Sequence, residues 1–371
     1  MYRRRRWTAA ALIVALATAV TIVIEAVLSD ERIGPDPSEI ERRYLRTVPD
    51  RALLGQMLMV RMNGSATPEL VRGARDGEIG GVIVFPPPGQ PEEELRAEIG
   101  RVQEAATAAG RPPLLVAIDQ EGGEVKRLPE GPPDSSAPEL GENGDPAEAR
   151  AAGRATGRYL ARLGINVDLA PVLDVPSTSA SFMTSRAFGD DPRAVGELGS
   201  AFAEGLEAGG VIPAVKHFPG LGRAVANTDL GPSELDASED ELEDDLVPFR
   251  EAIAREVPMV MVGNAIFQAL DPRAPAALSA AVVGDLLRDE LGFTGVVISD
   301  DLGAGAIDAA VSEREASVAA ARAGVDILLF AGTDDAGPAH EALLDARDRG
   351  ELSRADLERS LLRILELKRP H

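Results

Sequence analysis

Residues 211–229 read "VIPAVKHFPGLGRAVANTD", an apolar run that passes directly into a polar, glycine-containing loop. The run 211–216 is nearly continuous in apolar side chains, which is typical of a strand buried on both faces of a parallel sheet. The loop opens with two adjacent basic residues, Lys216 and His217, and continues with a Pro-Gly turn. A buried strand that ends in reactive side chains is the building unit of an α/β barrel enzyme.

The same unit recurs along the chain, bounded by turn-forming residues and separated by helix-like stretches. The other apolar runs are "GQMLMV" (55–60), "GGVIVF" (80–85), "PLLVAI" (113–118), "INVDLA" (165–170), "VPMVMV" (257–262), "GVVIS" (295–299) and "VDILLF" (325–330). With 211–216, eight strand–helix repeats predict an α/β fold, a single (β/α)8 barrel of the TIM type over residues 51–371. A doubly wound open sheet is the alternative.

Composition limits the function classes. Hydrophobic residues make up 44% of the 371 residues, which suffices for a core, and the formal net charge is −23. Such a negative balance argues against nucleic acid or an anionic membrane surface as a partner of the barrel. The chain has no cysteine and three scattered histidines, so we predict neither a metal site nor a cofactor. The glycines at 220–222 are too few for a nucleotide-binding fingerprint.

The N-terminal segment, residues 1–29, has a different character. Arg3–Arg6 precede an apolar block that is ended by Glu25, and the block is long enough to span a bilayer. This pattern predicts a signal anchor, with a cleaved signal peptide as the alternative; no clear cleavage site favours the anchor. Residues 30–50 are predicted to be a polar linker. The barrel is therefore expected outside the cytoplasm, anchored to the membrane or secreted.

Charged side chains follow several of the predicted strands. In barrels of this kind, catalytic groups lie just beyond the C-terminal ends of the strands. The residues in such positions are Asp119, Arg186, Lys216, His217, Asp300 and Asp301. Salt-bridged loops would account for any one of them but poorly for the full set.

Five motifs occur in order at barrel-like spacing. They are "AIDQEGG" (117–123), "APVLDV" (170–175), "SRAFGDDP" (185–192), "KHFPGLG" (216–222) and "GFTGVVISDDL" (292–302). Over roughly residues 50–368 the chain resembles glycoside hydrolase family 3, in particular its single-domain β-N-acetylglucosaminidases (the β-hexosaminidase subgroup).

The resemblance implies a retaining, exo-acting hydrolase of terminal β-linked N-acetylhexosamine. It implies that Asp300 is the nucleophile, and that the sugar hydroxyls are held by Asp119, Arg127, Arg186, Lys216 and His217. We expect Lys216 to keep the pKa of Asp300 low. Asp301 is expected to face the loop backbone. Outside the cytoplasm, cell-wall (peptidoglycan-type) fragments are the expected substrates. The sequence does not indicate an oligomeric state.

One loop departs from the family pattern. In these relatives it ends Asp-Ser/Thr-His, and the His is the general acid/base, whereas this chain has Asn227, Thr228 and Asp229. Three hypotheses follow. Asp229 is the acid/base, its pKa raised by burial and by Asp300, with Asn227 available to hydrogen-bond it. Alternatively, the acid is missing, and only good leaving groups are cleaved or the sugar is transferred to other acceptors. In the third, the barrel binds sugar without turnover. A family-3 β-glycosidase for a non-acetylated sugar remains the other enzyme hypothesis.

Overall fold

The computed structural model describes residues 37–369, and a compact unit that begins at Thr47 contains every strand. The predicted anchor (1–29) and the first part of the predicted linker lie outside the described residues. Helix α2 (Pro37–Thr47) precedes the compact unit. From residue 37 to residue 369, no helix is both long and apolar enough to cross a membrane.

Eight parallel strands form one sheet in the order β11-β9-β7-β6-β3-β2-β1-β12. Their bounds are β1 (Leu58–Met62), β2 (Gly81–Val84), β3 (Leu115–Ile118), β6 (Val167–Asp168), β7 (Ile212–Phe218), β9 (Met259–Val262), β11 (Val296–Ser299) and β12 (Leu328–Phe330). The two ends of the sheet meet where Ile298 bridges Ile327 in parallel. The predicted (β/α)8 barrel is therefore confirmed, and the open-sheet alternative is wrong.

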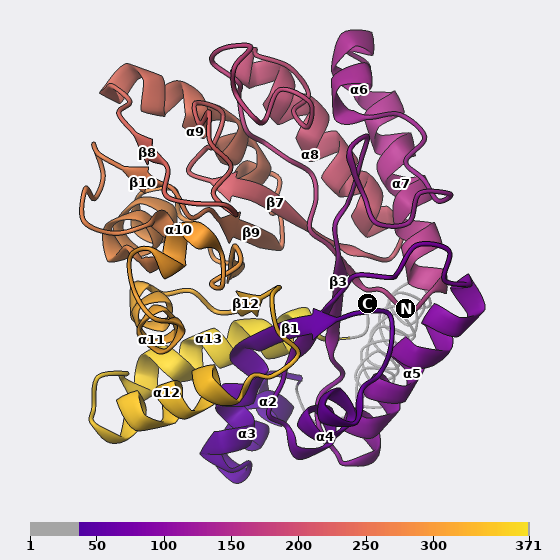
Figure 1. The fold of residues 1–371 in the computed structure, drawn as a ribbon, viewed down its shortest axis with the longest axis vertical. Helices are drawn as coiled ribbons and strands as arrows, with labels where there is room; N and C mark the ends of the chain where they lie inside the picture. The colour runs from indigo at the N-terminus through magenta and orange to yellow at the C-terminus, as the bar shows by residue number, and fades with distance from the viewer. Residues whose placement is uncertain (1–36, 370–371) are drawn as a thin grey trace, which may run out of the picture. The chain divides into compact units, whose positions relative to one another are not determined.

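Helices surround these strands (Figure 1). They are α3 (Asp50–Leu54), α4 (Pro68–Asp76), α5 (Glu92–Ala108), α6 (Ala137–Asn143), α7 (Pro146–Arg162), α8 (Pro192–Ala208), α9 (Glu239–Ala254), η3 (Ala281–Glu290), α10 (Gly305–Asp308), α11 (Glu313–Ala323), α12 (Gly337–Asp348) and α13 (Arg354–Leu367). Local sequence sets where they start. Ser238 and Glu241 form a capping box at the start of α9, which satisfies two amide groups at the helix start.

Several short elements lie at the end of the barrel where the strands terminate. β4 (Gln120–Gly122) and β5 (Val125–Lys126) form a hairpin directly after β3. β8 (Glu234–Leu235), in the segment after β7, pairs with β10 (Ile266–Phe267), in the segment after β9. Of the two 3-10 turns in the described residues, η2 (Ala276–Leu278) also follows β9, whereas η1 (Gly55–Met57) directly precedes β1 and lies at the opposite end. The loops after β3, β7 and β9 are thus tied into local structure, as expected for the functional face of such a barrel.

Candidate active site

A buried lysine at the end of β7 joins two carboxylates that follow β3. Lys216 Nζ lies 2.8 Å from Asp119 Oδ1 and 2.6 Å from Glu121 Oε1. Its side chain is 3% exposed. Although burial alone would lower it, the carboxylates of Asp119 and Glu121 raise the pKa of Lys216. Lys216 is therefore a fixed cation, and two of its three N–H groups are already committed.

Glu121 also holds an arginine from a different loop. Arg186 Nη2 donates to Glu121 Oε1 at 2.7 Å, and Nε donates to Oε2 at 2.9 Å. Burial raises the pKa of Glu121, yet the charges of Lys216 and Arg186 overcome that effect and hold it at about 2. Bidentate pairing of this kind fixes the plane of the guanidinium group. We call Asp119, Glu121, Arg186 and Lys216 the sugar wall from here on, after the role that the family resemblance implies for Asp119, Arg186 and Lys216.

His217 is oriented by a carboxylate that follows β6. Its Nδ1 lies 2.7 Å from Asp174 Oδ2, and both side chains are buried. Asp174 Oδ1 accepts the backbone N–H of Leu221 at 2.6 Å, so the same carboxylate also fixes the turn after β7. A carboxylate at Nδ1 favours the tautomer with hydrogen on that nitrogen. Nε2 of His217 is then the ring atom left to accept a hydrogen bond.

Asp300 stands at the end of β11. Its backbone N–H donates to the Val262 carbonyl at 2.8 Å, and its Oδ1 accepts the N–H of Asp301 at 2.8 Å. Burial raises the pKa of Asp300, Asp229 adds to the rise, and His217 and Lys216 oppose it. The expectation of a low pKa for Asp300 is therefore wrong, because the loss of solvation outweighs the opposing effect of Lys216 and His217.

The neighbouring carboxyl group of Asp301 faces backbone, as predicted. Its Oδ1 accepts N–H groups from Gly303 at 3.0 Å and from Ala331 at 2.9 Å. Its carbonyl accepts a bond from Asn264 Nδ2 at 2.7 Å. Asp301 therefore ties together the loops that follow β9, β11 and β12, and it presents its own N–H to Asp300.

Arg127 lies at the edge of the site. Its guanidinium group is 3.5 Å from Asp119 Oδ2 and 4.9 Å from the ring centre of Phe85, and its side chain is 40% exposed. The structure thus brings Arg127, Arg186 and Lys216 around the two carboxylates after β3. His217 shares β7 with Lys216 and lies within electrostatic reach of Asp300.

Residues 223–231, which we call the 223–231 loop, contain Asp229. The side chain of Asp229 is exposed, so the burial that the acid/base hypothesis requires is absent from this arrangement of the loop. Asn227 Oδ1 accepts the backbone N–H of Asp229 at 2.9 Å; no bond joins it to the Asp229 carboxyl group. Val225 and Leu230 are 67% and 85% exposed. The loop nevertheless lies within electrostatic reach of Asp300.

Two hydrogen bonds fasten the 223–231 loop to the segment after β11. The carbonyls of Thr228 and Asp229 accept N–H groups from Ala306 at 3.1 Å and from Gly305 at 3.0 Å. A Cβ atom on Gly305 would lie 2.7 Å from the backbone of Leu230. Only glycine allows this approach without a shift.

The sequence interpretation missed Glu121 and Asp174, although both lie inside the quoted motifs. Each is the partner of a side chain that was singled out. A buried ammonium or imidazole group needs a compensating acceptor, and asking which residues pair with Lys216 and His217 would have identified both carboxylates. Among the residues that the structure describes, no group of His, Asp and Glu has an arrangement that could hold a metal ion.

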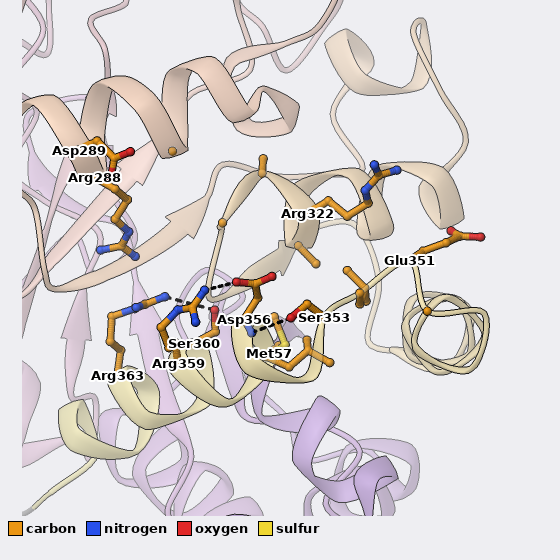
Figure 2. A pocket seen from close by; sticks show the side chains of 17 residues that line it. Met57, Arg288, Asp289, Arg322, Glu351, Ser353, Asp356, Arg359, Ser360 and Arg363 are labelled. Atoms are coloured by element: carbon orange, nitrogen blue, oxygen red, sulfur yellow. Dashed lines mark hydrogen bonds and ion pairs between the residues drawn. The ribbon is translucent and has the colours of Figure 1, made fainter.

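A separate cavity of about 540 Å³ lies between η3, α11 and α13 (Figure 2). Three of the four arginines that line it are paired with acidic groups: Arg288 and Arg363 both bind Asp326, and Arg359 binds Asp356. Asp326 precedes β12, so the cavity lies at the end of the barrel where strands begin. None of the predicted site residues lines it. Charged groups at that end of a barrel usually serve stability.

Comparisons with known proteins find glycoside hydrolases that match most of this chain. A protein of Arthroderma benhamiae named "Uncharacterized secreted glycosyl hydrolase" is 37% identical over 85% of this chain and 92% of its own length. The β-hexosaminidase LpqI of Mycobacterium tuberculosis is 34% identical over 86% of this chain and 83% of its own length. A family 3 β-N-acetylglucosaminidase structure from a Paenibacillus species superposes with a TM-score of 0.83 at 34% identity. That match covers 87% of this chain and 62%, less than two thirds, of the Paenibacillus chain.

The family model described as the glycosyl hydrolase family 3 N-terminal domain matches residues 51–367. The match begins at the residue where we placed the start of the barrel and contains every residue of the candidate site. This protein is therefore a glycoside hydrolase and belongs to glycosyl hydrolase family 3.

Proposed function

We propose that the protein is a retaining, exo-acting β-N-acetylhexosaminidase that uses Asp300 as its nucleophile and Asp229 as its acid/base. The sugar wall is the observation that carries the proposal. Its ion pairs fix the side chains of Arg186, Lys216 and Asp119 before substrate binds. These side chains therefore lose little conformational entropy on binding. The remaining N–H groups of Lys216 and Arg186 are suited to sugar hydroxyls.

The proposed reaction gives one role to each of the two carboxyl groups. Asp300 attacks the anomeric carbon while the bond to the leaving oxygen breaks, and that oxygen takes a proton from Asp229. Water then displaces Asp300 from the sugar and gives its proton back to Asp229. The hydrogen bond from Asp301 to Oδ1 leaves Oδ2 of Asp300 as the attacking atom. Asp229 is exposed in the free protein. For Asp229 to act as a buried acid, the bound substrate must shield its carboxyl group from water.

The names of the relatives support the choice of sugar. The Mycobacterium protein is a β-hexosaminidase and the Paenibacillus structure is a β-N-acetylglucosaminidase. The Arthroderma protein is described as secreted, which supports an extracytoplasmic location together with Arg3–Arg6 and the apolar block after them. We propose anchoring by that block, or secretion if it is cleaved. Cell-wall fragments of the peptidoglycan type are the proposed substrates, on the basis of location.

A covalent trap tests this proposal. Wild type should release nitrophenol from 4-nitrophenyl N-acetyl-β-glucosaminide and leave the matching glucoside nearly untouched. A fluorinated N-acetylglucosaminyl fluoride should label Asp300, as read by mass spectrometry of the peptide, and Asp300→Ala should not be labelled. Preference for the glucoside would favour the non-acetylated-sugar hypothesis. Stabilisation by N-acetylglucosamine with neither turnover nor labelling would favour a sugar-binding barrel.

A further inference from the structure

A carboxyl group without a charged partner lies beneath the sugar wall. Asp168 ends β6, and its side chain is fully buried at 0% exposure. It is in register with Ile118 of β3 and Pro213 of β7. Asp119 follows Ile118 directly, so Asp168 lies one layer deeper in the barrel than the sugar wall.

The contacts of Asp168 satisfy only one of its two oxygens. Oδ1 accepts the backbone N–H of Gln120 at 3.0 Å. Oδ2 is buried and has no hydrogen-bond partner in the described part of the protein. A buried carboxylate without a cation is strongly disfavoured, whereas a carboxylic acid is neutral and places its proton on the second oxygen. The unpartnered Oδ2 is therefore where a proton belongs.

The cation that acts on Asp168, Lys216, is already paired with two other carboxylates. The charged groups that act on Asp168 are Asp119, directly after β3, Glu121 in β4 and Lys216 in β7. Within the sugar wall, Lys216 and Arg186 already balance Asp119 and Glu121. Burial raises the pKa of Asp168 to about 8; the Gln120 N–H and Lys216 oppose the rise, and the two carboxylates add to it. An ionised Asp168 would thus be an uncompensated charge next to the sugar wall.

The hydrogen bond from the Gln120 N–H connects Asp168 to the two carboxylates of the sugar wall. Gln120 stands between Asp119 and Glu121, and its own side chain is held by the backbone of Leu128 and Pro132. By accepting the Gln120 N–H, Asp168 therefore helps to fix the backbone that carries Asp119 and Glu121, the two carboxylates of the sugar wall.

We propose that Asp168 is a positioning residue for the sugar wall that works as a neutral carboxylic acid, and that its ionisation draws Lys216 away from the sugar and weakens binding. The inference rests on the proposed function, because it takes Lys216 and Asp119 to be groups that hold the sugar. Asp168 itself touches neither the substrate nor the reacting atoms.

The pH dependence of KM tests the inference. For wild type on 4-nitrophenyl N-acetyl-β-glucosaminide, KM should rise about tenfold per pH unit above pH 8, because only the neutral form binds well. Asp168→Asn cannot ionise, so its KM should stay flat from pH 6 to 9.5 and within about threefold of wild type at pH 6.5. Asp168→Ala should have a raised KM at every pH. An alkaline rise that persists in Asp168→Asn, or a wild-type KM that stays flat, would overturn the inference.

A measurement without substrate separates this inference from the proposed function. In the folded protein Asp168 keeps its proton up to about pH 8, whereas in the unfolded chain it loses it near pH 4. The stability that this protonation contributes is fully present below pH 4. It falls progressively as the pH rises from 4 and is lost once the pH has passed 8. The thermal unfolding midpoint of wild type relative to Asp168→Asn should therefore fall between pH 4 and 8 and level off above.

The outcomes are distinct. If that fall is seen but wild type hydrolyses no substrate at any pH, the proposed function has failed while the protonation of Asp168 stands. If wild type hydrolyses substrate and the fall is absent, the inference has failed. Should Asp168→Asn not fold, the wild-type KM profile alone decides, because a flat profile up to pH 9.5 contradicts the inference.

Discussion

The sugar wall and the 223–231 loop face the same Asp300 but are built in opposite ways. Glu121 and Lys216 are each 3% exposed and are joined by an ion pair of 2.6 Å. In the loop, Asp229 is exposed and Leu230 is 85% exposed. Buried, fully paired groups hold one geometry, whereas exposed groups with few partners are free to adapt. Under the proposed function, the rigid region recognises the sugar, and proton delivery is assigned to a surface loop.

Removing the centre of the sugar wall should have the largest effect on folding stability. Glu121→Gln deprives Lys216 and Arg186 of their shared carboxylate. Breaking a buried ion pair on one side typically costs about 3–5 kcal/mol of folding free energy, and we expect kcat/KM to fall by about 10²-fold or more. Chemical denaturation and steady-state kinetics measure the two effects. Glu124→Gln is the matched control, since exposed Glu124 meets only Ser185. A variant within threefold of wild type would show that the wall is not the binding framework.

The two buried lysines sharpen the comparison between paired and unpaired charge. Lys216 has two carboxylates, whereas Lys368 donates only to neutral acceptors, Gln56 Oε1 at 2.8 Å and the Gly80 carbonyl at 2.7 Å. Burial lowers the pKa of Lys368 to about 7.

Between pH 7 and 10 the unfolded chain therefore binds one more proton than the folded one, and stability rises with pH. The free energy of unfolding of wild type relative to Lys368→Met should fall by on the order of 2–4 kcal/mol as the pH drops from 10 to 7, and stay level below. Denaturant titrations at several pH values measure this difference. A difference that is independent of pH would show that Lys368 is charged throughout that range.

A smaller effect is expected where the loop is fastened. Gly305→Ala should push the backbone of Leu230 away, because the added Cβ would lie only 2.7 Å from it. We expect about a tenfold loss of kcat on a substrate with a sugar leaving group, in line with a modest displacement of an acid. Affinity for N-acetylglucosamine, measured by calorimetry, should not change. Leu230→Ser, an exposed neighbour, is the control and should stay within about twofold. Equal losses on every substrate would mean that Gly305 serves the nucleophile instead.

The same contrast explains what could be predicted from the sequence. The barrel was predictable because each strand is a short apolar run with its own boundaries, and Lys216, His217 and Asp300 follow those strands directly. Glu121 and Asp174 were not assigned, because pairing across strands depends on which loops meet in space. The exposure of Asp229 and the raised pKa of Asp300 depend on how far the folded chain shields each residue from water. The sequence around each residue does not reveal this. The fastening of the loop by Gly305 is likewise a contact between distant segments.

The most direct test of the account compares two β-N-acetylglucosaminides, one with a nitrophenol and one with a sugar leaving group, on wild type and Asp229→Asn. A general acid matters most when the leaving group is poor. We predict that Asp229→Asn loses about 10² to 10⁴-fold in kcat/KM on the sugar leaving group and less than tenfold on nitrophenol. Equal losses on both substrates, or none on either, would contradict the assignment of proton delivery to the 223–231 loop.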